Sequence, residues 1–172
     1  MDSLETLKSQ IIGDIQIRIF EESFPRIRQC LSALELNEIW KRPNENSNSI
    51  GNLVLHLCGN IRQYIVSGLT ATKDVRKRSF EFSEIGPISA NELILKLDQL
   101  ELEVKPILQE LTIGELIRER EVQGFKITGT SILIHVTEHL SYHTGQIAFY
   151  TKALKNMDLK FYGDLDLDVL SS

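Results

Sequence analysis

The stretch that decides the fold is Ser131–Leu154, SILIHVTEHLSYHTGQIAFYTKAL. A helix turns by about 100° per residue, and this rotation gathers the apolar residues of the stretch on one side. The apolar stripe consists of Ile132, Val136, Leu140, Ile147, Tyr150 and Leu154. Such spacing is typical of the seam between helices in a bundle. The stretch is therefore predicted to form one long helix that packs against others.

Three of the four histidines lie on this predicted helix, at His135, His139 and His143. His143 falls on the apolar stripe and is expected to point into the core, whereas His139 lies about 40° away and His135 about 80° away. Residues four apart are neighbours on a helix, so His139 and His143 can bind one metal ion together. A buried histidine with an ordinary hydrogen-bond partner would show the same spacing. We favour the metal site, because an unsatisfied imidazole on an apolar seam costs about 1–3 kcal/mol.

The fourth histidine, His56, lies in the other strongly patterned stretch, SNSIGNLVLHLCGNIRQYI. Its apolar residues recur at helical spacing, at Ile50, Val54, Leu57, Ile61 and Tyr64. His56 lies about 120° from the centre of that stripe, so the period alone does not place it in the core. The segment LVLHLC is nevertheless apolar nearly all round, as in a helix that is covered on several sides. Ser47 or Ser49 is expected to cap this helix, which runs to about Gly68.

The first helical period covers residues 4–34, and Pro25 interrupts it. Proline lacks a backbone donor and its ring collides with the preceding turn, so we expect a kink there or a break near Glu22–Phe24. A further helix is predicted over Ser89–Leu111, where a serine and a glutamate three residues apart have the spacing of a capping box.

The long connection ATKDVRKRSFEFSEIGP mixes basic residues with Phe80 and Phe82. Such mixtures occur in segments that bind single-stranded nucleic acid. We expect instead that its arginines pair with Asp74, Glu81 or Glu84 and that its phenylalanines pack on the bundle, because the chain as a whole is acidic.

A second connection, Gly114–Gly129, has weak alternation and turn glycines, so a short extended excursion is predicted there. Thr128 or Thr130 is expected to cap the helix that follows. The tail Asn156–Ser172 is acidic and irregular, and its aromatic residues could dock on a partner surface.

Composition bounds the class of protein. The chain has 172 residues, 42% hydrophobic and 25% charged, which suits a single soluble domain over residues 1–172. A net charge of −5 argues against nucleic-acid binding. Neither a secretory signal nor an apolar run of about 18 residues is present, so no membrane association is expected. Cys30 and Cys58 lie in apolar helical patterns, and we expect them to be buried and reduced in a cytoplasmic protein.

Together these patterns predict an all-α fold, a four-helix bundle with long crossover connections. The two connections are long enough that consecutive helices need not follow a simple up-down-up-down order. The chemistry then depends on whether His56 reaches the histidines of the last helix.

Two motifs carry a resemblance to a known family. SNSIGNLVLHLCGN around His56 and EHLSYHTGQI around His139 and His143 resemble the DinB/YfiT-like superfamily of metal-binding four-helix bundles. The second motif has the superfamily's order of histidine, three residues, histidine, one residue and Gly-Gln. The resemblance extends over the whole chain in helix order and length. It implies a ligand triad of His56, His139 and His143, whereas His135 matches no triad position and is expected to be an outer or exposed histidine.

The resemblance also implies a cofactor and partners. Members typically bind one divalent transition metal ion, such as nickel or zinc, and are often homodimers. Characterised relatives include transferases that use low-molecular-weight thiols such as bacillithiol, and a mycothiol-dependent maleylpyruvate isomerase. A small-molecule substrate, in some cases a cellular thiol, is therefore expected.

Three neutral imidazoles leave an open coordination position on a metal ion. Asn60 and Gln146 are the candidates for orienting the ligand rings, whereas Glu138 points about 100° away from His139 and is not expected to bind. The leading hypothesis is a metal-dependent enzyme of the low-molecular-weight thiol S-transferase or hydrolase type, with catalytic residues unknown. The alternatives are a non-catalytic, stress-associated dimer that binds metal and a helical interaction module without metal.

Overall fold

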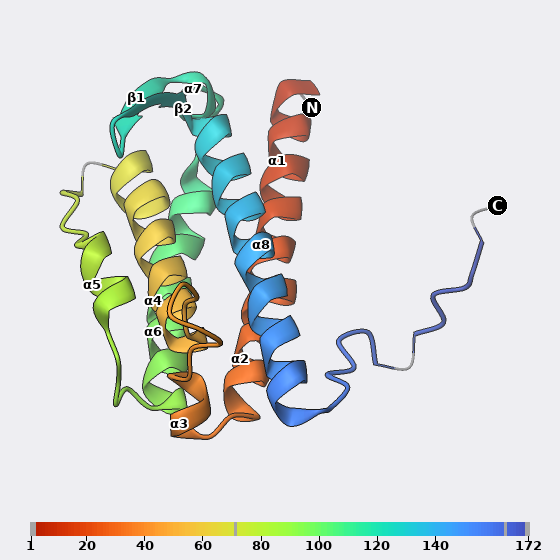
Figure 1. The fold of residues 1–172 in the computed structure, drawn as a ribbon. Helices are drawn as coiled ribbons and strands as arrows, with labels where there is room; N and C mark the ends of the chain where they lie inside the picture. Colours follow the sequence, from red (N-terminus) through yellow and green to blue (C-terminus); the bar gives the residue numbers. More distant parts are fainter. Residues whose placement is uncertain (1–2, 71, 164, 171–172) are drawn as a thin grey trace.

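The computed structural model describes residues 3–70, 72–163 and 165–170. Within these residues four long helical runs make up most of the molecule (Figure 1). The first consists of α1 (Ser3–Gln16), a π-helical segment (Ile17–Ser23) and α2 (Phe24–Ser32). The others are α4 (Ile50–Ile61) with a π-helical segment (Arg62–Ser67), α6 (Ala90–Glu110) and α8 (Gly129–Lys155). The all-α prediction is confirmed.

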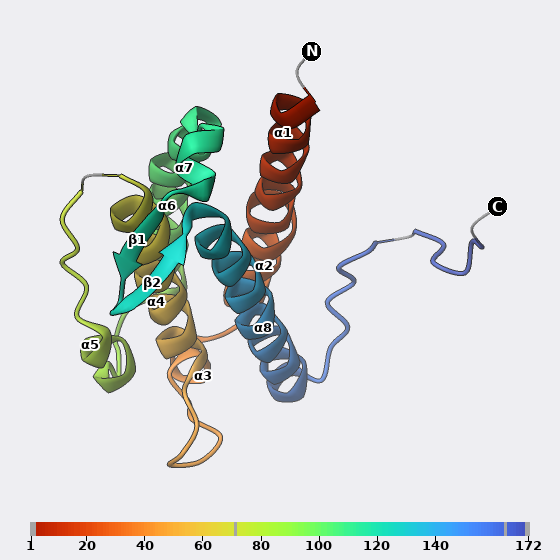
Figure 2. The same ribbon diagram turned by 90° about the horizontal axis from the view of Figure 1, so that it is seen from above.

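The four runs form a four-sided bundle. Helix α8 packs against α2 and α4, and α6 packs against the same two helices (Figure 2). Helices α4 and α6 run in the same direction, because the connection between them returns along the length of the bundle (Figure 1). The short helix α3 (Leu36–Ile39) lies in the connection from α2 to α4, and α5 (Arg78–Ser83) lies in the long connection from α4 to α6. The predicted bundle with long crossover connections is therefore confirmed, and α4 runs antiparallel to α8.

The helix starts follow the predicted capping residues. Ser49 accepts a hydrogen bond from the backbone N–H of Asn52 at the start of α4, at 3.1 Å. Ser89 caps α6 together with Glu92, and Thr128 caps α8. Each cap satisfies a backbone donor that has no partner within the helix.

Pro25 does not break the first run. The backbone stays helical from Ser3 to Ser32 and widens into the π-helical segment just before α2, whose second residue is Pro25. In a regular α-helix a proline ring collides with the carbonyl group four residues earlier, which here belongs to Glu21. Because Glu21 lies in the wider π-helical segment, the irregularity is accommodated within a continuous helix, and the break near Glu22–Phe24 does not occur.

The core lies along the shared axis of the four runs. Its fully buried side chains recur at the predicted helical spacing, as at Phe24, Ile27 and Leu31, at Val54, Leu57 and Ile61, at Leu93, Leu97 and Leu100, and at Ile132, Val136 and Leu140. Burial of apolar surface at about 25 cal/mol per Å² is the main force that holds such a bundle together. Most of the periodic stripes read from the sequence form the core, whereas Leu4, Leu7 and Ile11 at the start of the first run are exposed.

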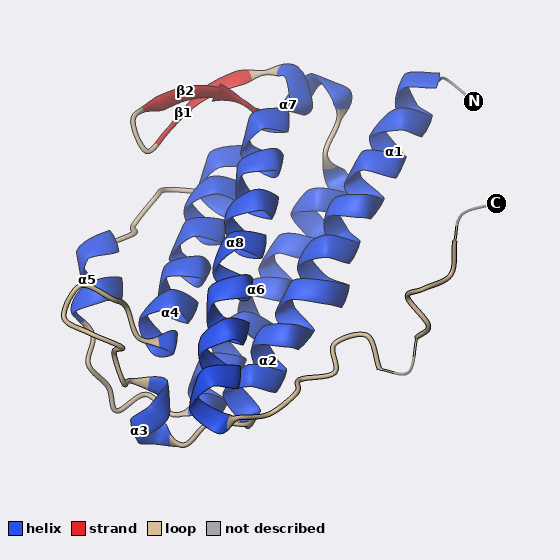
Figure 3. Cartoon of the chain, turned by 45° about the vertical axis from the view of Figure 1, so that its right-hand side comes forward, coloured by secondary structure: helices blue, strands red, loops and turns tan. Residues whose placement is uncertain are grey.

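The second connection forms the predicted extended excursion. After α7 (Ile113–Ile117), strands β1 (Glu119–Val122) and β2 (Phe125–Thr128) pair antiparallel across one end of the bundle (Figure 3). The two turn residues, Gln123 and Gly124, both have positive φ, at 54° and 79°, as in the two-residue turns that suit a hairpin. The tip of this hairpin lies close to the histidines described below.

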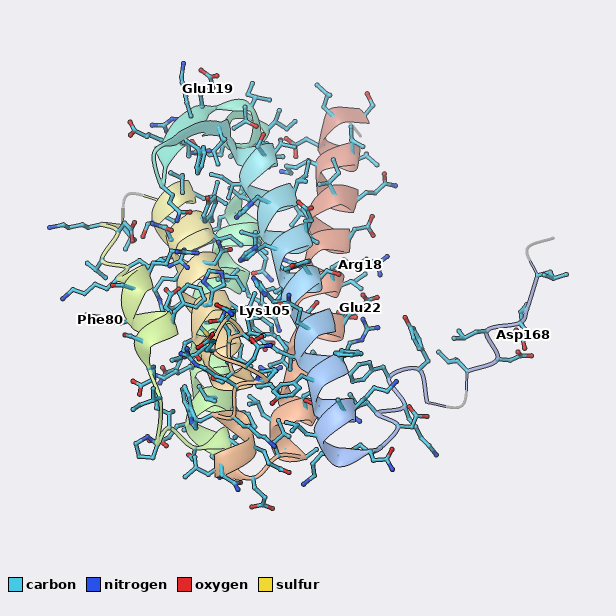
Figure 4. All side chains as sticks on the ribbon, viewed as in Figure 1. Arg18, Glu22, Phe80, Lys105, Glu119 and Asp168 are labelled. Carbon is cyan, nitrogen blue, oxygen red and sulfur yellow. The ribbon has the colours of Figure 1, made fainter. Side chains whose placement is uncertain are left out.

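The first connection agrees with prediction only in part. Arg76 forms the expected ion pair with Glu81, with Nε 2.7 Å from Oε1. Phe82 packs against His56, but Phe80, at the outer edge of the molecule (Figure 4), is 63% exposed. The prediction was wrong for Phe80, because α5 presents only one side to α4.

Both cysteines are free and buried, as predicted. Burial raises the pKa of Cys30 and raises that of Cys58 to about 12, so neither thiol ionises at neutral pH. Among the described residues, no helix is both long enough and apolar enough to cross a bilayer.

Candidate metal centre

His56, His139 and His143 meet between α4 and α8. Nε2 of His56 lies 2.8 Å from Nε2 of His139, and the ring centroids of His139 and His143 are 4.5 Å apart. One ligand nitrogen from each of the three rings lies within 4.8 Å of the other two. The spacing of four residues on α8 therefore does bring two rings together, and α4 delivers the third.

The depth of the rings differs from the sequence-based expectation. His56 is buried, with 5% of its surface exposed, whereas His139 and His143 are half-buried. The period left His56 undecided and put His143 in the core. The difference arises because α5 covers the outer side of α4, so that Phe82 packs 4.8 Å from the ring of His56. A segment distant in sequence thus buries His56.

Glu81 fixes the orientation of His56. Its Oε2 lies 2.9 Å from Nδ1 of His56, and both side chains are buried. A carboxylate can only accept a hydrogen bond here, so Nδ1 carries the proton and donates it to Glu81. The lone pair of His56 is therefore on Nε2, the nitrogen that faces His139. Metal-binding histidines commonly have such a carboxylate behind them.

Arg76 in turn holds Glu81. Its Nε and Nη2 donate to the two carboxylate oxygens at 2.7 and 2.8 Å, and its Nη1 donates to Gln63. Nη2 also lies 3.1 Å from Nδ1 of His56, because both donors share the same carboxylate oxygen. Burial raises the pKa of Glu81, but the hydrogen bonds from Arg76 and His56 outweigh it, and the net pKa is lowered. Glu81 therefore stays ionised at neutral pH.

Gln146 stands behind the third ring. Its Oε1 lies 2.7 Å from Nδ1 of His143, which again leaves Nε2 without a proton. Burial lowers the pKa of His143, and it lowers that of His139 to about 3, assisted by the neighbouring imidazoles. Both rings are therefore neutral at physiological pH, the form in which imidazole binds metals.

Asn60, the other candidate for orienting a ligand ring, contacts His135 instead. Its Nδ2 donates to Nε2 of His135 at 3.3 Å. Helices α4 and α8 are antiparallel. Asn60, one turn after His56 on α4, therefore lies opposite His135, one turn before His139 on α8. His135 is half-buried and stacks on Tyr64, with ring centroids 4.2 Å apart. It borders the cluster but does not join it.

A cavity of about 270 Å³ opens beside the cluster. Its floor is formed by α4 and α8, and its walls come from the first connection and from the hairpin tip. The lining residues are His56, Asn60, Arg76, Arg78, Gln123, Phe125, His135 and His139. A small molecule in this cavity would therefore lie against two of the three histidines.

The donor set suits a transition metal ion. Three imidazoles are common ligands of zinc, nickel and copper, and catalytic zinc sites combine three protein ligands with one open position. Two nitrogens bound to one ion lie at most about 4 Å apart, so small rotations of the rings bring all three to a common ion. Together the three histidines can hold one metal ion.

The sequence did not identify Glu81 and Arg76 as parts of this site. Glu81 was expected only as an ion-pair partner in the first connection. It lies 25 residues from His56 in sequence, in a segment without helical period, so no local pattern connects the two. The one available signal was that the first connection places a basic and an acidic residue close to Phe82, which packs on α4.

A comparison with known protein families finds one model that matches most of the chain. The family model described as Protein of unknown function (DUF1572) matches residues 14–163, a span that includes all four histidines. No curated protein matches the chain.

Several solved structures share the fold. The DinB-like protein YjoA from Bacillus subtilis is 21% identical with a TM-score of 0.64, covering 89% of this chain and 96% of that one. A conserved protein from Enterococcus faecalis is 13% identical with a TM-score of 0.65, covering 91% of this chain and 100% of that one. A DinB-like protein from Bacillus cereus is 17% identical with a TM-score of 0.61, covering 78% and 87%. At these identities the likeness shows the fold alone.

Proposed function

We propose a function from one premise: the chain belongs to the family described as Protein of unknown function (DUF1572), a DinB-like family. In this proposal His56, His139 and His143 hold one divalent transition metal ion, with nickel and zinc as the first candidates. The protein is then a metal-dependent enzyme of the thiol S-transferase or hydrolase type that acts on a small molecule.

One observation carries the proposal. Two of the rings have their Nδ1–H groups engaged by acceptors, Glu81 for His56 and Gln146 for His143, which leaves Nε2 of both free to bind a metal. Burial keeps the imidazole of His139 neutral between them. Three imidazoles, two of them held in orientation by these acceptors, beside a cavity that His56 and His139 line, match the donor set of a catalytic rather than a closed structural site.

When bound, the ion would supply Lewis acidity that lowers the pKa of a water or thiol ligand. The side chains of this protein prepare the site for it. Glu81, itself held by Arg76, fixes the ring of His56 through Nδ1, and Phe82 packs against that ring. Both described cysteines are buried and protonated, so a reacting thiol must come from a substrate. Together with the motif resemblance, this favours a cellular thiol as one substrate.

The competing proposal is a non-catalytic, stress-associated dimer in which the ion joins α4 to α8. It is favoured by the lining of the cavity, which contains no carboxylate that could act as a general base. The two proposals differ in what occupies the open position. Slow exchange of solvent and no response to any thiol would favour the non-catalytic dimer.

The metal site is tested by elemental analysis of purified protein after loading with nickel or zinc and dialysis. About one ion per chain is expected for the wild type, and His143→Ala should retain almost none. His135→Ala is the matched control, because His135 lies on the same helix and beside the cluster but should leave metal retention unchanged. Equal retention by His143→Ala and the wild type would refute the triad.

The reaction is tested by screening the loaded protein against several cellular thiols with electrophilic acceptors. Thiol consumption that depends on the metal and disappears in His143→Ala supports the transferase. Absence of turnover with every thiol and with ester substrates would leave the non-catalytic dimer as the better proposal. A homodimer in the cytoplasm is part of both proposals, and light scattering after gel filtration measures the oligomeric state.

A further inference from the structure

The cavity beside the histidine cluster is lined by positively charged residues and by no negatively charged ones. Arg76 and Arg78 both line it, and none of its lining residues is acidic. Arg76 is fully engaged, since its guanidinium donates to both oxygens of Glu81 and to Gln63. Its side chain is only 5% exposed. The positive charge of Arg76 is therefore compensated within the protein.

Arg78 has no such compensation. It is exposed, and among the described residues no carboxylate lies within ion-pair distance of its guanidinium. The guanidinium carbon instead lies 4.8 Å from the ring centroid of Phe82, in a cation–π contact that restrains the side chain without neutralising it. In a chain with a net charge of −5, this leaves one free positive charge at the mouth of the cavity.

The position of Arg78 relates it to the cluster. The ring of Phe82, on which it rests, lies 4.8 Å from the ring of His56. A molecule that reaches from Arg78 to the histidines needs to be only a few bonds long, which agrees with a cavity of about 270 Å³, at the small end for ligand sites. A planar guanidinium pairs with a carboxylate or a phosphate through two parallel hydrogen bonds, and the carboxylate is the smaller of the two.

A second observation is an unmet hydrogen bond on a residue that lines the cavity. Asn60 is buried, with 3% of its surface exposed, and lines the cavity. Its Oδ1 has no hydrogen-bond partner, while its Nδ2 donates to His135. Turning the amide over would leave Nδ2 unpaired in the same place. Buried polar atoms are rarely left without a partner, so a donor from a ligand or water is expected there.

We propose that this cavity selects small carboxylate-bearing molecules and that Arg78 is the residue that binds the carboxylate. The other end of the ligand binds at the histidine cluster, and in this respect the proposal rests on the proposed function. Phe125, from the hairpin tip, adds an apolar wall, so the ligand combines a charged end with a short apolar part.

The test uses two probes that differ only in charge: 3-mercaptopropionate and its neutral amide, 3-mercaptopropionamide. Both are titrated into cobalt-loaded protein, and binding is read from the absorption change when the thiol reaches the metal. The wild type should bind the carboxylate about tenfold more tightly than the amide, and the preference should shrink as salt is added. Arg78→Ala should bind both probes equally, and Arg78→Glu should prefer the amide.

Lys77→Ala is the matched control, because Lys77 is the neighbouring exposed cation but does not line the cavity. It should keep the full preference for the carboxylate. An unchanged preference in Arg78→Ala, or none in the wild type, would overturn the proposal.

The metal content of each variant is measured first. Loaded protein without a carboxylate preference would refute the role of Arg78 and leave the metal site standing. If no metal binds, the same probe pair is measured on the metal-free protein by saturation-transfer NMR, where equal signals from the two probes would again refute it.

Discussion

Helix α8 separates two hollows of different character. On the side that faces α4 lies the cavity of about 270 Å³ beside the histidines. On the side that faces α1 and α2 lies a groove of about 820 Å³, lined largely by apolar or small residues such as Ile15, Leu133, Ile134 and Ala148. The charged residues that line the groove include Arg18 and Glu22, which pair with each other at 2.6 Å (Figure 4).

The difference teaches that volume does not locate the chemistry. In the groove Arg18 and Glu22 satisfy each other. In the smaller cavity Arg78 has no acidic partner among the described residues, and Asn60 has an unpaired oxygen. The groove also holds an unpaired buried hydroxyl, Oγ1 of Thr144, so the histidine cluster and the unpaired cation, rather than size, mark the site where a ligand would bind.

The largest expected effect comes from the support behind His56. Glu81→Ala removes the acceptor that fixes its ring and should weaken metal affinity about 10- to 100-fold, as loss of such supporting groups typically does. Glu22→Ala removes a carboxylate from the groove instead and should leave metal affinity unchanged. Competition titration with a metal-binding dye measures both. Equal affinities in the two variants would mean that Glu81 does not support the site.

A smaller loss of metal affinity should come from a substitution at Gly59, which is not one of the proposed metal-binding residues. A Cβ atom at this position would overlap Oε1 of Glu81 and approach Nε of Arg76. Gly59→Ala should therefore displace Glu81 and reduce metal affinity about tenfold, less than loss of the carboxylate. Circular dichroism checks that the helices persist. Unchanged affinity in a folded variant would show that Glu81 can shift without releasing His56.

His139, which lines the cavity, should also affect how the stability of the metal-free protein depends on pH. His139 has a pKa of about 3 in the folded protein and about 6.5 when unfolded, mainly because of burial. Below about pH 6.5 the unfolded chain binds a proton that the folded chain refuses, so this contribution to stability falls as the pH drops toward 3. Urea unfolding at several pH values, with chelator present, measures it. His139→Gln should show a shallower loss; an identical slope would contradict the assignment.

The smallest effect is expected in the groove, where a glycine is again replaced by alanine and the free energy of unfolding is measured. Gly145 lies inside α8, and apart from the adjoining helix backbone no atom lies within 4 Å of a Cβ built there. Gly145→Ala should raise the free energy of unfolding by about 0.5–1 kcal/mol, since glycine is costly inside a helix, and should leave metal affinity unchanged. Thermal unfolding of the metal-free protein measures the gain. A loss of stability would mean that the groove is more tightly packed than its open face indicates.

The sequence by itself determined the parts that depend on local periodicity. Apolar residues at helical spacing located the four runs, and serine or threonine caps marked the starts of the last three to within two residues, because caps act within one helical turn. The spacing of four placed His139 and His143 together, and the spacing of three placed Gln146 beside His143, for the same reason.

Only the tertiary structure decided what surrounds those residues. His56 is buried because α5 covers it, Glu81 reaches it across 25 residues, and Asn60 meets His135 because α4 and α8 are antiparallel. Arg78 and Phe125 reach the cavity from two connections that have no period. Helical spacing fixes neighbours within a few residues, whereas contacts between distant segments depend on how the chain crosses the bundle, which no short pattern encodes.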